Sequence, residues 1–218
     1  GSAESCLHPL YLAGFRRMGV LSIFPRPFDF RRDGFVIGEG AGILVLERES
    51  DARARNVRIY AELAACSLGA DTAHPVSFDP DGAAISRVLD RALNSAELNP
   101  DDVDYINAHG TGTHLNDIAE TRALKKTLRA AALSVPVSST KGSTGHLLGA
   151  SASVEAALCC LSIRDGNVPP TANLNEPDPQ CNLNLVRGNA QNIAVRTSVS
   201  LSYGFGGAVG AVVLRKLS

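Results

Sequence analysis

The sequence predicts an α/β protein, in which strands and helices alternate along one chain. Short apolar segments of strand length are separated by segments whose apolar residues follow the helical period. Glycine-rich polar loops follow directly after several predicted strands, and strand ends are where ligands bind in α/β sheets. The predicted strands are residues 35–46, 56–63, 103–107, 134–138, 194–201 and 208–214.

The first two predicted strands come before a loop that divides the chain. Residues 35–46 are apolar and rich in glycine, which is typical of a strand buried on both faces. Residues 56–63 alternate between polar and apolar side chains, as a half-buried strand does. Between Asp71 and Gly82 the sequence turns to Asp, Pro, His and Ser. This change of composition predicts a boundary between two subdomains.

Two helices are predicted on either side of the strand at residues 103–107. The first begins at Asp81, whose side chain would cap it, and its apolar residues between 85 and 93 share one face. The second covers residues 117–130. Asp117 and Glu120 stand in its first turn, where we expect them to accept its free N–H groups.

The last part of the chain predicts one more helix and a hairpin. Residues 147–163 are rich in Ala, Ser and Gly, so neighbouring elements can pack very close to this helix. The strands at 194–201 and 208–214 are joined by a segment that contains Gly204, Gly206 and Gly207. Such a segment favours a tight hairpin turn.

Composition excludes several classes of protein. The chain has 218 residues, 44% hydrophobic and 20% charged, with a net charge of -1, so nothing favours nucleic acid or an anionic membrane as a partner. No apolar run approaches the ~18 residues that span a bilayer. The five cysteines form neither a CxxC pair nor a disulfide framework. This indicates a reducing compartment, so we expect the cytoplasm, with an organelle matrix equally compatible.

Three short motifs carry the chemistry of the chain. They are residues 107–113 (NAHGTGT), 138–146 (SSTKGSTGH) and 202–207 (SYGFGG). Each places a chemically capable side chain among small residues that let the backbone approach a ligand closely. The first two follow predicted strands, so we expect both to lie at the ligand-binding edge of the sheet.

Two histidines and a lysine in these loops predict a site for an anion. Neutral imidazoles of His109 and His146 whose N–H groups point at one spot would stabilise charge on a carbonyl oxygen. Lys141 would keep the potential positive and the histidines neutral, and Glu155 is placed to pair with it. A single histidine in a loop is usually a surface or capping residue, but this explanation weakens when two recur with a lysine. A metal site lacks a third nearby ligand.

Thr111 and Thr113 alternate with glycine and offer two hydroxyls along one edge. They suit hydrogen bonds to an extended, amide-bearing substrate, and simple turn chemistry explains them equally well. Residues 204–209 do not complete a dinucleotide-binding GxGxxG, because Val209 stands in the place of the last glycine. The loop at Lys141 is not a P-loop, because its lysine precedes the glycines.

The three motifs, in this order, resemble those of the β-ketoacyl synthases, the condensing enzymes of fatty-acid and polyketide synthesis. The resemblance covers nearly the whole chain and includes residues 27–29 (PFD), 32–40 (RDGFVIGEG) and 169–174 (PPTANL). It implies a thiolase-like fold, a layered αβαβα sandwich of two similar halves that is incomplete in this chain. By this resemblance, residues 1–72 are the tail of the N-terminal half and residues 73–218 are the C-terminal half.

The resemblance also implies catalytic roles. His109 and His146 are similar to the histidine pair that assists decarboxylation of a malonyl thioester and binds the enolate oxygen. Lys141 is similar to the lysine that supports this site, with Glu155 as its ionic partner. Glu120 matches an acidic residue with a structural role behind the site.

The substrate side of the site is implied in the same way. Thr111 and Thr113 match the threonines that hold the phosphopantetheine arm of acyl carrier protein, and the family keeps no permanent cofactor. Phe205 resembles a gating phenylalanine whose backbone N–H joins an oxyanion hole, and Gly204 precedes it in the substrate-binding motif.

The family's nucleophile has no counterpart here. In the family, a cysteine in an Ala-Cys-Ser type sequence lies well upstream of the first histidine, and no such sequence occurs in this chain. Cys6 lies in a segment that resembles the one after the nucleophile's helix. Leu201 replaces an asparagine of the family pattern, Tyr203 a phenylalanine and His114 a proline. We therefore expect the isolated chain to be inactive.

Two classes of function remain open. The first is an acyltransferase: the C-terminal portion of a synthase that condenses an acyl thioester with malonyl-acyl carrier protein. The second is a non-catalytic partner, similar to the chain-length-factor subunits of ketosynthase heterodimers. Retention of both histidines and the lysine favours the first. The expected partners are acyl carrier protein, the missing N-terminal half, and a second ketosynthase-type subunit in a homodimer or heterodimer.

Overall fold

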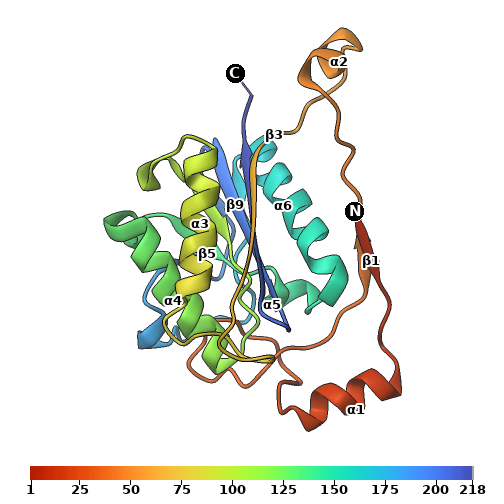
Figure 1. Ribbon diagram of the computed structural model, residues 1–218, viewed down its shortest axis with the longest axis vertical. Coiled ribbons are helices and arrows are strands. Elements are labelled where there is room, and N and C mark those ends of the chain that lie inside the picture. The colour runs from red at the N-terminus through yellow and green to blue at the C-terminus, as the bar shows by residue number, and fades with distance from the viewer. Residues whose placement is uncertain (218) are drawn as a thin grey trace.

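The computed structural model describes residues 1–217, and a six-stranded sheet forms its centre (Figure 1). In the sheet order below, the second strand is antiparallel to both of its neighbours, and the last four strands, from β9 onward, are parallel. The order is β3 (Glu62–Ala70), β10 (Ala208–Arg215), β9 (Thr197–Gly204), β4 (Tyr105–Asn107), β5 (Pro136–Ser138) and β7 (Asn184–Leu185). The chain is therefore a mixed α/β protein.

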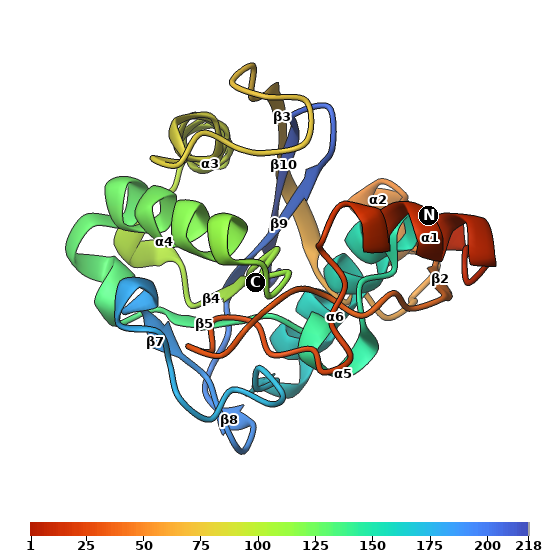
Figure 2. The same ribbon diagram turned by 90° about the horizontal axis from the view of Figure 1, so that it is seen from below.

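Helices cover both faces of this sheet (Figure 2). On one face lie α3 (Ala83–Ser95) and α4 (His114–Leu128), and on the other lies α6 (Ser151–Asp165). Ile85 and Leu89 of α3 are fully buried in the main core. Burial of each such side chain contributes about 1.5–3 kcal/mol. The amphipathic period of the sequence thus gives α3 its place on the sheet.

A second, two-stranded sheet packs on the far side of α6 (Figure 1). It joins β1 (Ser2–Glu4) to β2 (Gly40–Gly42) in antiparallel register. A side chain at Gly42 would lie 2.7 Å from the backbone N of Val154 in α6. The small residues of the predicted helix therefore do permit close packing, and α6 lies between two sheets. The layers run in the order helices, sheet, helix, sheet.

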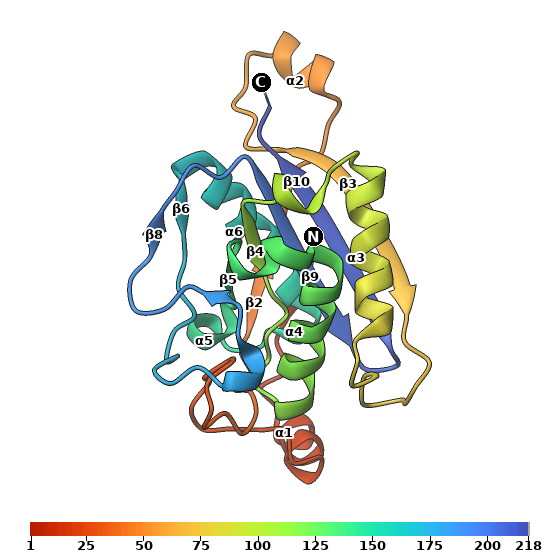
Figure 3. The same ribbon diagram turned by 90° about the vertical axis from the view of Figure 1, so that its left-hand side faces the viewer.

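The remaining elements are short. In the view of Figure 3, α1 and α2 lie at opposite ends of the molecule. No helix within residues 1–217 is long and apolar enough to cross a membrane. The shorter elements are α1 (Pro9–Arg17), α2 (Glu49–Ala54), α5 (Lys141–Thr144), β6 (Asn167–Val168), β8 (Gln191–Asn192), η1 (Pro100–Asp102), η2 (Arg129–Leu133), η3 (Leu148–Ala150) and η4 (Pro179–Cys181).

The predicted strand at residues 35–46 is largely wrong. Only Gly40–Gly42 forms a strand, and Ile43 and Val45 are 82% and 85% exposed. The segment has strand-like composition, but beside its pairing with β1 it makes only isolated bridges within residues 1–217, from Phe35 to Leu21 and from Ile37 to His146. The strand predicted at residues 56–63 is displaced, since β3 begins at Glu62. Its true core is glycine- and alanine-rich, a composition that does not stand out as a strand.

Asp81 does not cap α3. Gly82 is the N-cap residue, in left-handed conformation with φ of 62°, and makes no side-chain hydrogen bond to the helix. Asp79 accepts a hydrogen bond from the backbone N of Ala83 at 3.4 Å instead. The helix predicted at residues 117–130 is α4, which begins earlier, at His114. The helix predicted at residues 147–163 is α6, which starts at Ser151 after one turn of 3-10 helix.

The hairpin prediction is confirmed. Strands β9 and β10 pair from Gly204 and Ala208 outward, and the turn between them contains Gly206 and Gly207 at φ of 81° and 78°. The sheet also includes β3, which lies before residue 72. The division into residues 1–72 and 73–218 stays a prediction.

Replacing Gly207 with alanine should lower the free energy of unfolding by about 2–4 kcal/mol. The added methyl group would overlap the backbone carbonyl of Asp71, and the backbone conformation is left-handed. Gly206→Ala is the matched control, because its φ is also left-handed but nothing lies within 4 Å of the new methyl group. The control should lose only about 1–2 kcal/mol. Urea unfolding of both variants measures the difference, and equal losses would contradict the prediction.

Candidate functional site

The three sequence motifs meet at one edge of the sheet. Strands β9, β4 and β5 are adjacent and parallel, so the loops at their carboxyl ends point the same way. His109 follows β4, Lys141 begins α5 after β5, and Tyr203 is the last residue but one of β9. The predicted placement of these loops at a common edge is confirmed.

The His109 ring is held by a hydrogen bond at its Nδ1 atom, which leaves the Nε2 atom for a ligand. The ring is buried, with the residue 4% exposed, and its Nδ1 accepts the backbone N–H of Tyr203 at 3.3 Å. A neutral imidazole that accepts at Nδ1 carries its proton on Nε2. We therefore assign His109 as an Nε2 donor.

His146 is held in the same way by a different element. Its Nδ1 accepts the backbone N–H of Leu148 at 3.2 Å and lies 3.0 Å from the hydroxyl of Ser151. That hydroxyl in turn accepts the backbone N–H of Leu147. The proton of His146 is again on Nε2. In each histidine, the Nδ1 lone pair accepts a hydrogen bond from a backbone amide, and the Nε2–H remains available as a donor to a ligand.

The two rings lie close together and are kept neutral. Their centroids are 5.4 Å apart and their planes are inclined by 85°. Burial, and then the charge of Lys141, lower the pKa of His146 to about 3. Burial, Lys141 and His146 hold the pKa of His109 well below its usual range. At neutral pH, the pair offers two uncharged N–H donors.

Lys141 and Glu155 form the buried ion pair that the sequence predicts. The Lys141 Nζ lies 2.5 Å from the Glu155 Oε1, and the two side chains are 1% and 3% exposed. Burial raises the pKa of Glu155, while the charge of Lys141 opposes this rise. The pair joins α5 to α6 and brings a positive charge behind the two imidazoles.

Glu120 and Asp117 act on the loop before α4 and not on the helix itself. Glu120 accepts the backbone N–H groups of His109 and Gly110, both at 2.8 Å. Asp117 accepts the backbone N–H groups of Gly112 and Phe28. The expectation that these carboxylates satisfy the first turn of their own helix is wrong. The loop folds over the helix start, so its N–H groups reach the carboxylates first.

Thr111 and Thr113 place their hydroxyls side by side. The two Oγ1 atoms are 3.0 Å apart, with Thr111 buried and Thr113 partly exposed. Their loop passes very close to its neighbours, since a side chain at Gly112 would lie 2.8 Å from the backbone oxygen of Gly34. The structure therefore supplies two neighbouring hydroxyls at the rim of the site.

Phe205 is linked to His146 through two intervening rings, Phe15 and Phe35. Its side chain is 48% exposed and stacks on Phe15 of α1, with ring centroids 6.2 Å apart. Gly204 is the last residue of β9 and pairs with Ala208. The turn they form is fixed by backbone bonds, including the N–H of Gly206 to the carbonyl of Pro75 at 2.7 Å.

Two residues around the site, Ser151 and Arg32, carry little signal in the sequence. Ser151, which orients His146, is one serine of an Ala-Ser-rich helix start. Arg32 is fully buried and binds Asp178 at 2.7 Å and Asp117 at 3.4 Å. It ties the segment before β2 to the start of α4. Arg32 stands in a segment that resembles the family pattern, which is the only signal that finds it.

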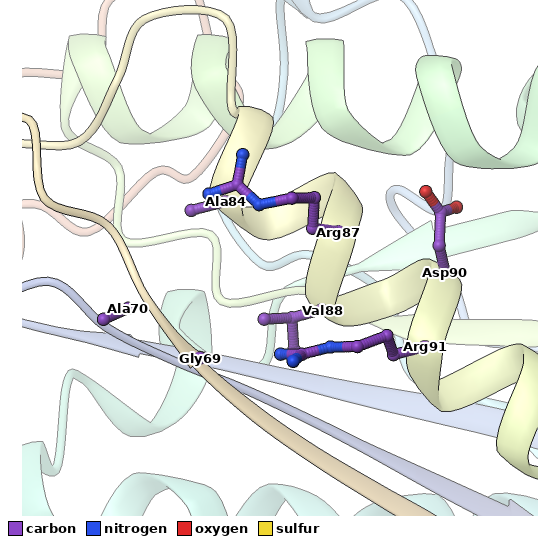
Figure 4. Close-up of a pocket in the computed structure, with 7 residues that line it drawn as sticks. All are labelled: Gly69, Ala70, Ala84, Arg87, Val88, Asp90 and Arg91. Atoms are coloured by element: carbon purple, nitrogen blue, oxygen red, sulfur yellow. The ribbon is translucent and has the colours of Figure 1, made fainter.

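One hollow away from the histidines lies between α3 and β3 (Figure 4). It measures about 420 Å³, and Arg87, Asp90 and Arg91 extend from α3 along it. Arg91 donates to the backbone carbonyl of Leu68 at 2.7 Å, which occupies part of the free edge of β3. Among residues 1–217, no three His, Cys, Asp or Glu side chains are placed to hold a metal ion.

The fold and the paired histidines define a class of protein. Layers of helix, sheet, helix and sheet around a small-residue helix, with polar loops at one sheet edge, form a thiolase-like chain. Solved structures agree. A ketosynthase complex with its acyl-carrier protein from a type II polyketide synthase (AntDE with AntF) matches with a TM-score of 0.98 and 38% identity. The match covers 100% of this chain and 55% of that one.

The chain belongs to the β-ketoacyl synthase family. The model of the β-ketoacyl synthase C-terminal domain matches residues 60–175, and that of the N-terminal domain matches residues 1–52. A 3-oxoacyl-[acyl-carrier-protein] synthase 2 of Synechocystis sp. (strain ATCC 27184 / PCC 6803 / Kazusa) is 44% identical over 95% of the chain and 51% of its own length.

Two further relatives extend the comparison. A synthase of the same description from Staphylococcus aureus (strain COL) is 42% identical over 99% of the chain and 54% of its own length. The structure of the ishigamide ketosynthase/chain length factor matches with a TM-score of 0.94 and 36% identity, over 100% of this chain and 53% of that one. The chain thus spans about half the length of the curated relatives it matches.

Proposed function

We propose that this chain supplies the decarboxylating part of a β-ketoacyl synthase site, and so acts in acyl transfer. One observation carries the proposal: His109 and His146 both accept a backbone amide at Nδ1 and keep an Nε2 donor for the site. Two neutral donors in a buried setting stabilise an oxyanion without giving up a charge of their own. The buried Lys141 adds a positive charge behind them.

The proposed reaction has three steps. A cysteine thiolate from outside this chain attacks an acyl thioester, forms a new thioester and releases the carrier thiol. A malonyl thioester then loses CO₂, and the electron pair of the broken C–C bond forms an enolate whose oxygen accepts the N–H groups of His109 and His146. The enolate carbon attacks the enzyme-bound acyl carbonyl, and the cysteine thiolate leaves. The product is a 3-ketoacyl thioester on the carrier.

The substrate arrives on an arm that the rim hydroxyls suit. The Oγ1 atoms of Thr111 and Thr113 lie 3.0 Å apart at the edge of the buried site. We propose that they bind amide groups of the phosphopantetheine arm of acyl carrier protein. The turn at Gly204 and Phe205 is assigned to the acyl side of the substrate, because Phe205 is exposed at the end of β9.

In this proposal, another part of the ketosynthase completes the site. Ile43, Val45 and Leu46 follow β2 and are 82%, 85% and 70% exposed. Such a row of apolar side chains marks an interaction surface. We propose that it packs against the N-terminal ketosynthase half, to which residues 1–72 would belong while residues 73–218 form the C-terminal half. A homodimer or heterodimer of ketosynthase type is part of the same proposal.

The second candidate is a non-catalytic partner subunit. The observation in its favour is the similarity to a ketosynthase/chain length factor structure described above. Against it stands the electrostatic design of the site, because a scaffold gains nothing from two neutral histidines and a buried lysine. A measured decarboxylation rate that depends on His109 or His146 separates the two candidates.

The isolated chain should gain no acyl group when it is incubated with an acyl thioester. Burial raises the pKa of Cys159 and of Cys181 to about 12, and the pKa values of Cys6 and Cys160 are raised as well. These thiols are therefore poor sources of the thiolate that attacks a thioester. Intact mass spectrometry measures the outcome.

The control uses a Cys66→Ser variant, since Cys66 is exposed and can be acylated chemically. The complete ketosynthase that contains this chain should gain one acyl group under the same conditions. An acyl group on the isolated Cys66→Ser chain would overturn the assignment of the nucleophile to another part of the protein.

A further inference from the structure

Tyr203 contacts both the imidazole ring of His109 and the Glu120 carboxylate that binds the backbone of His109. Its backbone N–H donates to the His109 Nδ1 at 3.3 Å, and its ring lies 4.8 Å from the imidazole, measured between centroids. Its hydroxyl donates to the Glu120 Oε1 at 3.2 Å. Glu120 also accepts the backbone N–H groups of His109 and Gly110. One residue therefore reaches the ring and, through a carboxylate, the backbone of the same histidine.

Among residues 1–217, Glu120 is the one hydrogen-bond partner of the Tyr203 hydroxyl. The residue is 6% exposed, and its ring packs edge-on against Phe78 with centroids 5.7 Å apart. Burial, and then the charge of Glu120, hold the pKa of the phenol well above its usual range, so the group stays a donor. A phenylalanine would fill the same space and make the same backbone bond. The hydroxyl thus adds one interaction, to Glu120.

We propose that Tyr203 is a positioning residue, whose hydroxyl locks Glu120 against the His109–Gly110 turn and thereby fixes the direction of the His109 Nε2–H. The catalytic consequence rests on the proposed function. The positioning itself does not, because it is a statement about hydrogen bonds within the chain. Three donors meet the carboxylate: Tyr203 and His109 at Oε1, and Gly110 at Oε2.

The charge of Glu120 decides whether these donors have an acceptor. Burial raises its pKa to about 7, and Asp117 on the same helix pushes in the same direction. The N–H groups of Gly110 and His109 and the charge of Lys141 on α5 oppose the rise. Removing the Tyr203 hydroxyl removes a donor that favours the ionised form. The carboxyl then takes up a proton at higher pH, and the turn loses its acceptor.

The test is the pH profile of malonyl decarboxylation by the complete ketosynthase carrying Tyr203→Phe. The acid limb should move to higher pH by about one unit, which is the effect of one hydrogen bond to a charged group. At pH 7 the rate should fall about fivefold, because the ionised fraction of Glu120 drops from about one half to about one tenth, and at pH 9 it should return to near the parent value. Recovery at high pH is a result that a merely structural loss does not give.

Tyr105→Phe is the matched control. Tyr105 is also fully buried, and its hydroxyl lies 2.9 Å from that of Ser138 on β5, away from Glu120. This variant removes a buried phenol oxygen as well, so it should lose stability and leave the acid limb unchanged. An acid limb that stays in place in Tyr203→Phe, or that moves equally in both variants, overturns the proposal.

A second readout is independent of the reaction. Nitrogen NMR of ¹⁵N-histidine-labelled protein reports which ring nitrogen of His109 carries the proton. The parent should show the Nε2–H signal of His109 as the pH is lowered to the acid limb. In Tyr203→Phe this signal should already disappear at a higher pH than in the parent. If decarboxylation is absent in the parent, the proposed function fails while this spectrum still tests Tyr203. Should Tyr203→Phe not fold, 3-fluorotyrosine at this position, a stronger donor, should move the transition to lower pH, and an unchanged transition contradicts the proposal.

Discussion

Replacing His146 with alanine in the complete ketosynthase should lower the rate of malonyl decarboxylation by a factor of about 10²–10³, as loss of one oxyanion donor does elsewhere. His109→Ala should have an effect of the same order. Each imidazole is buried, and the backbone amide at its Nδ1 fixes the direction of its Nε2–H, so the truncated side chain removes an oriented donor. Release of CO₂ from malonyl-acyl carrier protein is the measurement.

Two further variants sharpen this prediction. His146→Gln keeps an N–H donor near the former Nε2 position, so it should lose less activity than His146→Ala. His74→Ala is the control, because His74 is exposed and only accepts the backbone N–H of Val76. A decarboxylation rate that survives His146→Ala and His109→Ala unchanged would remove the basis of the proposed function.

Replacing Lys141 with methionine should lower the free energy of unfolding by about 3–5 kcal/mol, which is the effect of leaving one partner of a buried ion pair alone. Glu155 would stay buried, and its Oε2 already has no hydrogen-bond partner among the described residues. Lys141→Met together with Glu155→Leu removes both charges and should recover most of the loss. Urea unfolding of the parent, both single variants and the double variant completes the cycle.

The same cycle separates stability from catalysis. The double variant should fold well and still decarboxylate poorly, because the positive charge behind the two imidazoles is gone while burial still keeps both rings neutral. Arg53→Met is a suitable exposed control, since its ion pair with Glu49 lies at the surface and is worth less than about 1 kcal/mol. If the losses of the two single variants simply add in the double variant, the pair has no coupling and the prediction is wrong.

Local rules of sequence predicted much of the sheet and its loops. The hairpin at Gly206 and Gly207 follows from turn chemistry, and the meeting of His109 and Lys141 follows from their places after parallel strands. The strand expected at residues 35–46 failed because composition shows that a segment can be a strand and not whether a partner strand lies beside it. Ile43 and Val45 are apolar and still exposed.

The hydrogen bonds of the site were beyond such rules. The predicted helix start at residue 117 put Glu120 in the first turn, where a carboxylate normally accepts the helix's own N–H groups. Because α4 begins at His114, Glu120 lies beyond that turn. Here it accepts those of His109 and Gly110, because the preceding loop folds back over it. The donor to the His109 Nδ1 is the amide of Tyr203, which is distant in sequence. Contacts of this kind depend on the whole fold, so no window of sequence contains them.

The orientation of the two imidazoles has a consequence for the kind of substrate that can react. With both Nδ1 lone pairs occupied by backbone amides, the two imidazoles present protons and no free lone pair. Such a pair can stabilise an enolate by hydrogen bonds, but it cannot form one by removing a proton from carbon. The nucleophile must therefore arrive with its own leaving group. A malonyl unit carries one, its carboxylate, and an acetyl unit does not, so under the proposed function the histidine pair favours the carboxylated extender.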